Sequence, residues 1–190
     1  SPLGTAFTPE QARLLSRYAQ RVVLAFDPDT AGEVATLRGI DVLVEAGLQV
    51  QVAQLPMGMD PDEVVRSFGP QALTHAMEQA MSVMEFLLAC AAKRYEVQGA
   101  EGKVQAAQFI LPTIAKIPNA MLRTEYVRLV ADRLRLDEQA VAKELKQSKP
   151  REAQASSGLP PRAPAVSGAE QVFTALVLDE PSRLDAVAGE

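Results

Sequence analysis

Two short acidic motifs contain the residues of this sequence that are best suited to chemistry. In each motif a proline separates two aspartates, Asp27 from Asp29 and Asp60 from Asp62. Residues two apart in an extended strand point to the same side, so Asp27 and Asp29 would aim two carboxylates at one place. Carboxylate oxygens suit Mg²⁺ or Mn²⁺, and a cation would relieve the repulsion between two like charges. The first motif therefore predicts half of a divalent-metal site.

Each motif also has a purely structural explanation, because Asp is a favoured N-cap of helices. Asp29 would cap a helix that begins at Thr30, and Asp27 would then be a solvated strand end. For the second motif the capping explanation is stronger, because a proline and an acidic first turn make a good helix start. Two such pairs after neighbouring strands favour the metal interpretation for both, and both interpretations stay open at this point.

The first 60 residues predict alternating helices and strands. Thr8 and Gln11 form a capping box around Pro9, which predicts a helix to about residue 20. Residues 22–26 are a continuous apolar run typical of a buried parallel strand, and a second strand is expected around 49–52. The helix between them, at 30–46, ends at Gly47. This order predicts parallel strands with crossover helices, whose carboxyl ends would bring both acidic pairs to one edge.

After residue 60 the pattern becomes helical throughout. Helices are expected at about 60–69, 70–79, 82–95, 103–117, 120–134 and 138–147. Pro112 should kink or split the fourth of these, at residues 103–117. Residues 148–167 are rich in Pro, Ser, Ala and Gly, as in a flexible linker, and 170–178 resume a helical pattern. The predicted fold class is α/β followed by all-α: a partial parallel sheet with crossover helices, then a helical bundle and a truncated helical tail.

Composition limits the classes of function. Within 190 residues no apolar run approaches the roughly 20 residues of a membrane helix, so we expect a soluble chain with no membrane partner. The start at Ser1 shows no signal peptide and suggests a cut from a longer protein. The single Cys90 excludes an internal disulfide framework and an all-cysteine zinc cluster, and fits a reducing cytoplasm. A net charge of −5 argues against strong non-specific DNA binding by the whole chain, but not against a local basic track.

Several stretches resemble bacterial DnaG-type DNA primase, in the latter part of its Toprim catalytic core. Residues 24–32 resemble the Asp-x-Asp-x-Ala-Gly motif of that family, and residues 55–63 resemble its Leu-Pro-x-Gly-x-Asp-Pro-Asp motif. Residues 3–12 and parts of the helical region, including 80–87 and 117–118, are similar as well. The resemblance covers about residues 1–147, and 170–178 resemble the first helix of the helicase-binding domain of the family.

The resemblance implies a domain plan. Residues 1–69 would be the C-terminal part of the Toprim domain, 70–147 the helical subdomain of the primase core, 148–168 a flexible linker, and 169–190 the truncated start of the helicase-binding domain. It also implies an enzyme, a cytoplasmic nucleotidyltransferase that synthesises RNA primers from ribonucleoside triphosphates on single-stranded DNA at replication forks. A replicative helicase would be its partner.

The resemblance further assigns roles to the acidic residues. Asp27 and Asp29 become catalytic metal ligands, and Asp60 and Asp62 become an outer pair that holds a second Mg²⁺ or Mn²⁺ ion. Zinc is expected only in an N-terminal domain outside this chain.

Two departures from the family pattern matter. Pro28 stands where the family most often has Gly, which removes a backbone N–H. The glutamate that Toprim domains carry on an earlier strand has no counterpart, so the chain alone is expected to be inactive as a polymerase. Another Toprim enzyme, such as a nuclease or topoisomerase, and a non-catalytic interaction module are the alternatives.

Overall fold

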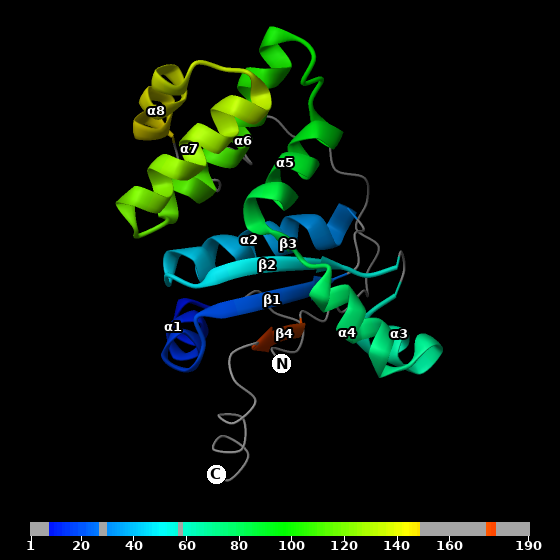
Figure 1. Cartoon of the computed structure of the whole chain (residues 1–190). Coiled ribbons are helices and arrows are strands. Elements are labelled where there is room, and N and C mark those ends of the chain that lie inside the picture. Colours follow the sequence, from blue (N-terminus) through cyan, green and yellow to red (C-terminus); the bar gives the residue numbers. More distant parts are fainter. Residues whose placement is uncertain (1–7, 27–29, 57–58, 149–173, 178–190) are drawn as a thin grey trace. The chain divides into compact units, whose positions relative to one another are not determined.

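The structure, a computed structural model, describes residues 8–26, 30–56, 59–148 and 174–177 (Figure 1). The chain divides into two compact units between Val83 and Met84, and the described residues 174–177 belong to the first unit. The predicted linker at 148–168 lies outside the described residues except for its first residue. Among the described helices, none combines the length and the apolar character that crossing a bilayer requires.

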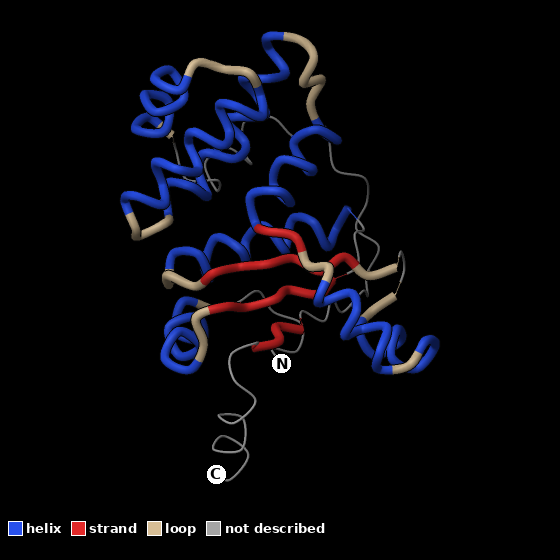
Figure 2. The backbone as a smooth tube through the Cα atoms, viewed as in Figure 1, coloured by secondary structure: helices blue, strands red, loops and turns tan. Residues whose placement is uncertain are grey.

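A small mixed sheet organises the first unit (Figure 2). Strands β1 (Arg21–Phe26) and β2 (Gln49–Gln54) are parallel, with Arg21 opposite Gln49 and Phe26 opposite Gln54. Helix α2 (Thr30–Glu45) connects them, as the alternating pattern predicted. Strand β3 (Met81–Ser82) pairs antiparallel with β2, and β4 (Thr174–Val177) pairs antiparallel with β1, which gives the order β3-β2-β1-β4.

Local signals determine where the first helices begin and end. In α1 (Pro9–Tyr18) the Thr8 hydroxyl accepts from the Gln11 amide at 3.3 Å, and the Gln11 side chain accepts from the Thr8 amide at 3.0 Å. The predicted capping box is therefore confirmed. After α2 the chain turns at Gly47, whose φ of 82° lies in the left-handed region that glycine adopts at little cost.

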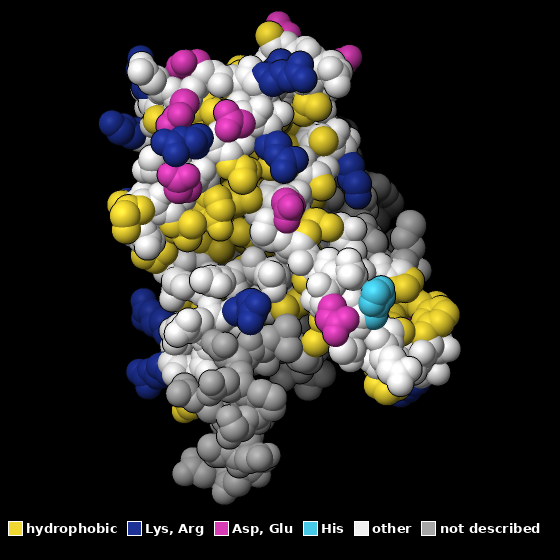
Figure 3. Space-filling view, viewed as in Figure 1, with side chains coloured by type: hydrophobic (Ala, Val, Ile, Leu, Met, Phe, Trp, Pro, Cys, Tyr) yellow, Lys and Arg dark blue, Asp and Glu magenta, His cyan; other side chains and the backbone are white. Residues whose placement is uncertain are grey.

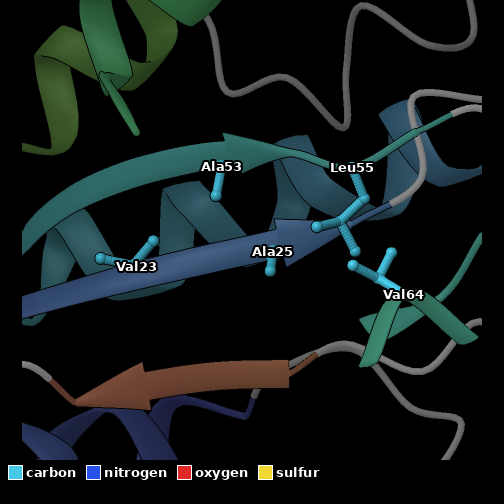
Figure 4. Close-up of a cluster of buried hydrophobic side chains, with 5 residues drawn as sticks. All are labelled: Val23, Ala25, Ala53, Leu55 and Val64. Atoms are coloured by element: carbon cyan, nitrogen blue, oxygen red, sulfur yellow. The ribbon is translucent and has the colours of Figure 1, made fainter. Parts of the chain in front are cut away.

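Apolar side chains cover both faces of the two parallel strands. Val23, Ala25 and Ala53 point to one face and form a buried cluster with Leu55 and with Val64 from the following helix (Figure 4). The alternate residues of the strands are also buried and point the other way, towards α2, which packs against β1 and β2: Val22, Leu24, Val50 and Val52. Burial on both faces explains why residues 22–26 are apolar without alternation.

The first unit extends further along the chain than the predicted boundary at residue 69. Helices α3 (Pro61–Phe68) and α4 (Pro70–Glu78) pack against the sheet, because partly buried Leu73, Ala76 and Met77 cover the cluster around Val64. Strand β3 then adds to the edge of β2. The α/β unit therefore includes α3, α4 and β3, although residues 70–79 have the pattern of an ordinary bundle helix.

The helical tail predicted at 170–178 is wrong over Thr174–Val177, which form β4. Val177 lies opposite Val22 and Thr174 opposite Ala25, so the segment satisfies backbone groups along the outer edge of β1. β-Branched Thr174 and Val177 suit an extended strand, and an open edge beside a buried strand favours pairing over a helix. The other residues of the predicted tail lie outside the described parts of the chain.

The second unit is the predicted helical bundle. It contains α5 (Val83–Arg94), α6 (Ala100–Lys116), α7 (Ala120–Leu134) and α8 (Glu138–Gln147), and α6, α7 and α8 pack against one another. Asn119 and Asp137 cap α7 and α8 through their side-chain oxygens. Helix α6 continues through Pro112, which is buried, so of the two effects predicted for this proline, a kink or a split, the split is wrong.

The loop between α5 and α6 approaches the next helix very closely. A Cβ atom built on Gly102 would lie 2.0 Å from the carbonyl oxygen of Glu96, so only glycine fits there. Beside this contact, the Tyr95 and Phe109 rings meet edge to face with centroids 6.1 Å apart. The Arg94 guanidinium lies 5.1 Å from the centre of the Phe109 ring. These contacts join α5 to α6 within the unit.

Candidate metal site

The carboxyl ends of β1 and β2 bring the two acidic motifs to one edge of the sheet. Phe26, the last residue of β1, lies opposite Gln54, the last residue of β2. Asp27 and Asp29 follow β1 directly and lie outside the described residues, so their metal role remains a prediction. The chain after β2 leaves the sheet at the same end and reaches Asp60 at the start of α3 (Figure 1).

Buried contacts hold the start of α3 near the end of β1. Leu55, directly after β2, and Val64, in the first turns of α3, are almost fully buried. Both belong to the cluster that contains Ala25, which is two residues before Asp27, and Figure 4 shows their side chains pointing towards one another. Asp60 precedes Val64 by one helical turn. The packing therefore supports a shared edge for the two acidic motifs.

Asp60 is a helix cap, as its capping explanation predicted. Its Oδ1 accepts a hydrogen bond from the Glu63 amide at 2.8 Å, and Glu63 Oε2 accepts from the Asp60 amide at 3.0 Å. Pro61 occupies the first turn, where a missing N–H costs nothing. A carboxylate has two oxygens with several lone pairs, so a cap through Oδ1 is compatible with a cation at the other oxygen. Capping and metal binding therefore do not exclude each other at this residue.

Asp62 lies on the exposed side of the same helix. Its Oδ2 is 2.8 Å from an Arg66 guanidinium nitrogen, and the two side chains are 65% and 77% exposed. Sequence reasoning passed over this pair, although its spacing of four residues on a helix was a usable signal. An exposed pair of this kind adds little stability, so Arg66 is a weak competitor for the carboxylate. Asp62 is therefore accessible to a cation from solvent.

The donor chemistry of the four predicted ligands fits a hard cation. All four are carboxylates, and Mg²⁺ and Mn²⁺ prefer oxygen ligands. Among the residues that the structure describes, no group of three or more His, Cys, Asp or Glu side chains is placed to hold a metal. Asp27 and Asp29 are not among those residues.

Comparison with known proteins identifies the family. A Toprim-like family model matches residues 1–65, and a model of the DnaB-helicase binding domain of primase matches residues 84–139. The DNA primase of Clostridium acetobutylicum is 37% identical over 139 residues, which are 73% of this chain and 23% of that protein. The chain belongs to the bacterial DnaG-type primases. It spans about a quarter of the length of the curated primases that it matches.

Solved primase structures share the fold. A DNA primase domain from Pseudomonas aeruginosa matches with a TM-score of 0.66 and 27% identity over 74% of this chain and 45% of that domain. A DnaG primase catalytic domain bound to single-stranded DNA matches with a TM-score of 0.60 and 29% identity, over 68% of this chain and 43% of that one. The primase relationship and the α/β-then-helical fold class are therefore confirmed.

The two family matches bear differently on the predicted domain plan. The Toprim-like match covers β1, α2 and β2, together with both acidic motifs. The helicase-binding match runs from α5 to the first two residues of α8, in the region predicted as the helical subdomain of the core. Helicase binding was predicted instead at residues 169–190. Those residues have no part in this match, and the predicted domain plan remains a prediction.

Proposed function

We propose that this chain is part of a primase that synthesises RNA primers on single-stranded DNA by metal-dependent nucleotidyl transfer. The observation that carries the proposal is the pair of acidic motifs beyond the carboxyl ends of two parallel, in-register strands, in a chain of the primase family. Ligand sites of α/β folds lie at these strand ends. The protein would then act in the cytoplasm, where chromosomal DNA is copied.

The acidic residues divide into an inner and an outer pair. Asp27 and Asp29 would hold Mg²⁺ or Mn²⁺ next to the sheet, and Asp60 and Asp62 would face the same region from the start of α3. The bound ions would activate the primer hydroxyl and neutralise the phosphates of the incoming ribonucleoside triphosphate. Asp60 would keep its cap while facing the site, so the helix start would fix the position of its carboxylate.

Primer synthesis by the complete protein tests the proposal. The complete protein, with and without the double change Asp27→Ala and Asp29→Ala, is given ribonucleotides and a single-stranded DNA template. We expect RNA synthesis to fall by at least about 100-fold, the usual cost of removing a group that stabilises transition-state charge. Glu78→Ala, an exposed carboxylate at the end of α4, is the matched control and should leave synthesis unchanged.

Two results would contradict the proposal. The first is full primer synthesis by the double variant. The second is DNA cleavage or relaxation by the wild-type protein without RNA synthesis, which would favour a nuclease or topoisomerase. The isolated 190-residue chain should make no primers, because it has no counterpart of the Toprim glutamate.

A helicase-binding role for the second unit is a second candidate, supported by the family match at residues 84–139. Hydrophobic side chains gather over the amino-terminal end of α7 (Figure 3), where Met121 is 77% exposed and Leu122 is also exposed. The chain, with and without Met121→Ser and Leu122→Ser, is used in a pull-down with the replicative helicase. Loss of capture in the variant would support the role, and the absence of capture by the wild-type chain would contradict it.

A further inference from the structure

Helix α1 has an outer face that nothing among the described residues covers. Leu14 is 53% exposed and Tyr18 is 55% exposed, and they stand one turn apart on the helix. Arg13 and Arg17 form a second exposed row beside them, also one turn apart. The opposite face buries Ala12, so the exposed rows are the outward side of the helix. We call this surface, together with exposed Arg21 at the start of β1, the α1 strip.

The strip is rich in positive charge, of which Glu10 offsets only the part on Arg13. Within the described parts of the chain, neither Arg17 nor Arg21 takes part in an ion pair, whereas Arg66 and Arg128 are held by carboxylates. The nearest acidic group on the helix is Glu10. Hydrogen bonding to its own backbone amide, and then to Thr8, lowers the pKa of Glu10, and Arg13 adds a smaller effect.

The combination of arginines with an exposed aromatic ring fits single-stranded nucleic acid. Guanidinium groups bind phosphates, and a tyrosine ring offers a flat apolar surface on which an unpaired base stacks. Arginines one turn apart can engage neighbouring phosphates of one strand, with Leu14 supplying apolar contact to the sugar or base. Because the whole chain carries a charge of −5, an anionic strand is attracted to this strip and not to the surface in general.

The position of the strip separates it from the acidic motifs. Helix α1 leads into the amino end of β1, and the acidic motifs follow the carboxyl ends of β1 and β2. Six residues of strand span about 20 Å. Basic side chains stand out beside α1 in Figure 3, at the amino end of the strands. A strand on the strip would therefore be held well away from the reacting end.

We propose that the α1 strip is a second contact surface for single-stranded DNA, which holds the strand away from the predicted metal site. The proposal rests on the proposed function, because a template strand is the ligand that this chemistry and that function share. Arg13, Arg17 and Arg21 contact phosphates, and the Tyr18 ring stacks on a base. The strip therefore contributes to affinity for the strand and not to the chemical step.

Fluorescence anisotropy of a labelled oligo(dT) strand with the 190-residue chain tests the strip. In the triple variant Arg13→Gln, Arg17→Gln, Arg21→Gln, we expect at least about tenfold weaker binding and a shallower salt dependence, by about 0.7 in log–log slope for each lost phosphate contact. Tyr18→Ala should weaken binding about fivefold without changing the slope, because stacking is not electrostatic. Arg66→Gln with Arg128→Gln is the matched control, since those arginines are already paired, and it should bind like the wild type.

The proposal is overturned if the wild-type chain does not bind the strand, or if the triple variant binds it as the wild type does. It is also overturned if the triple change abolishes binding to vesicles that contain phosphatidylserine but leaves DNA binding intact. Circular dichroism melts check that the variants fold. In the complete protein, the double change Asp27→Ala, Asp29→Ala should stop primer synthesis but leave DNA binding by the α1 strip unchanged. An error in the proposed strip and an error in the proposed function therefore give different results.

Discussion

The α/β unit and the helical unit differ in the role that we predict for their acidic side chains. In the helical unit Arg128 contacts Glu125 on its own helix at 3.1 Å and Glu138 at the start of the next helix at 3.6 Å. In the α/β unit a parallel strand pair brings Asp60 towards the segment that follows β1, across a whole crossover helix. The first arrangement pairs opposite charges, whereas the second, with Asp27 and Asp29 placed as predicted, would gather like charges that a fold alone has no reason to gather.

The units should therefore respond differently to substitution. Changes to the acidic motifs should remove cation binding at little cost in stability. Changes in the helical unit should cost stability and leave cation binding unaffected. Substitutions in the 190-residue chain test this contrast.

Removing the inner acidic pair should have the largest effect. The double change Asp27→Ala, Asp29→Ala should weaken Mn²⁺ or Mg²⁺ binding by more than about 100-fold, because even residues that only orient metal ligands contribute about 10- to 100-fold. Titration calorimetry measures the affinity. Asp132→Ala, an exposed carboxylate of α7, is the control. Equal affinities for wild type and double variant would show that Asp27 and Asp29 do not bind the cation, which contradicts the predicted difference between the units.

Truncating a core side chain of the helical unit should have the second largest effect. Ile110→Ala removes a fully buried side chain from α6 and should lower the free energy of unfolding by about 2–5 kcal/mol, through lost burial and a residual cavity. Urea denaturation followed by circular dichroism measures the change. Val104→Ala, at an exposed position of the same helix, should cost far less. Similar losses for the two variants would mean that α6 does not bury Ile110 as described.

A side chain at Gly102, where the backbone of Glu96 lies very close, should destabilise the helical unit through a steric clash. Gly102→Ala places a methyl group against the Glu96 carbonyl, so the α5–α6 loop must shift, at about 1–3 kcal/mol. In an ordinary helix position alanine would be the more stabilising residue. A gain in melting temperature would show that the loop is not packed against the helix.

Two substitutions at Asp60 test its role as a helix cap separately from the role of its charge. Asp60→Ala loses the cap and should lower the free energy of unfolding by about 0.5–2 kcal/mol. Asp60→Asn keeps an equally good cap and should leave stability nearly unchanged while weakening cation binding, since the charge is gone. Thermal melts and calorimetry on both variants make the comparison. If Asp60→Asn binds the cation like the wild type, the residue is only a cap.

The exposed Asp62–Arg66 pair should matter least for stability. Arg66→Ala should change the free energy of unfolding by less than about 1 kcal/mol, as is usual for surface ion pairs. If Asp62 is an outer ligand, the same change should strengthen cation binding slightly, because a competitor for its carboxylate is removed. Weaker cation binding in Arg66→Ala would argue against that role.

Much of the local structure follows from short stretches of sequence. Thr8 with Gln11, Asn119 and Asp137 mark helix starts, and Gly47 marks an end, because each acts on backbone groups only three or four residues away. The apolar run from Val22 predicts a buried strand, because uninterrupted apolar side chains need both faces of the strand covered. The cap formed by Asp60 was predictable on this basis too.

The tertiary structure decided what depends on contacts between distant residues. It assigned α4 to the sheet through Leu73 and Met77, paired Thr174–Val177 with β1 in place of a helix, and pressed Gly102 against Glu96. None of these has a local signal, because each depends on which backbone edge or side chain arrives from elsewhere in the chain. The sequence alone thus determined most of the helices, the two parallel strands and the positions of the acidic motifs in the chain. The packing of Leu55 and Val64 beside Ala25 decided that the start of α3 lies at the carboxyl end of β1.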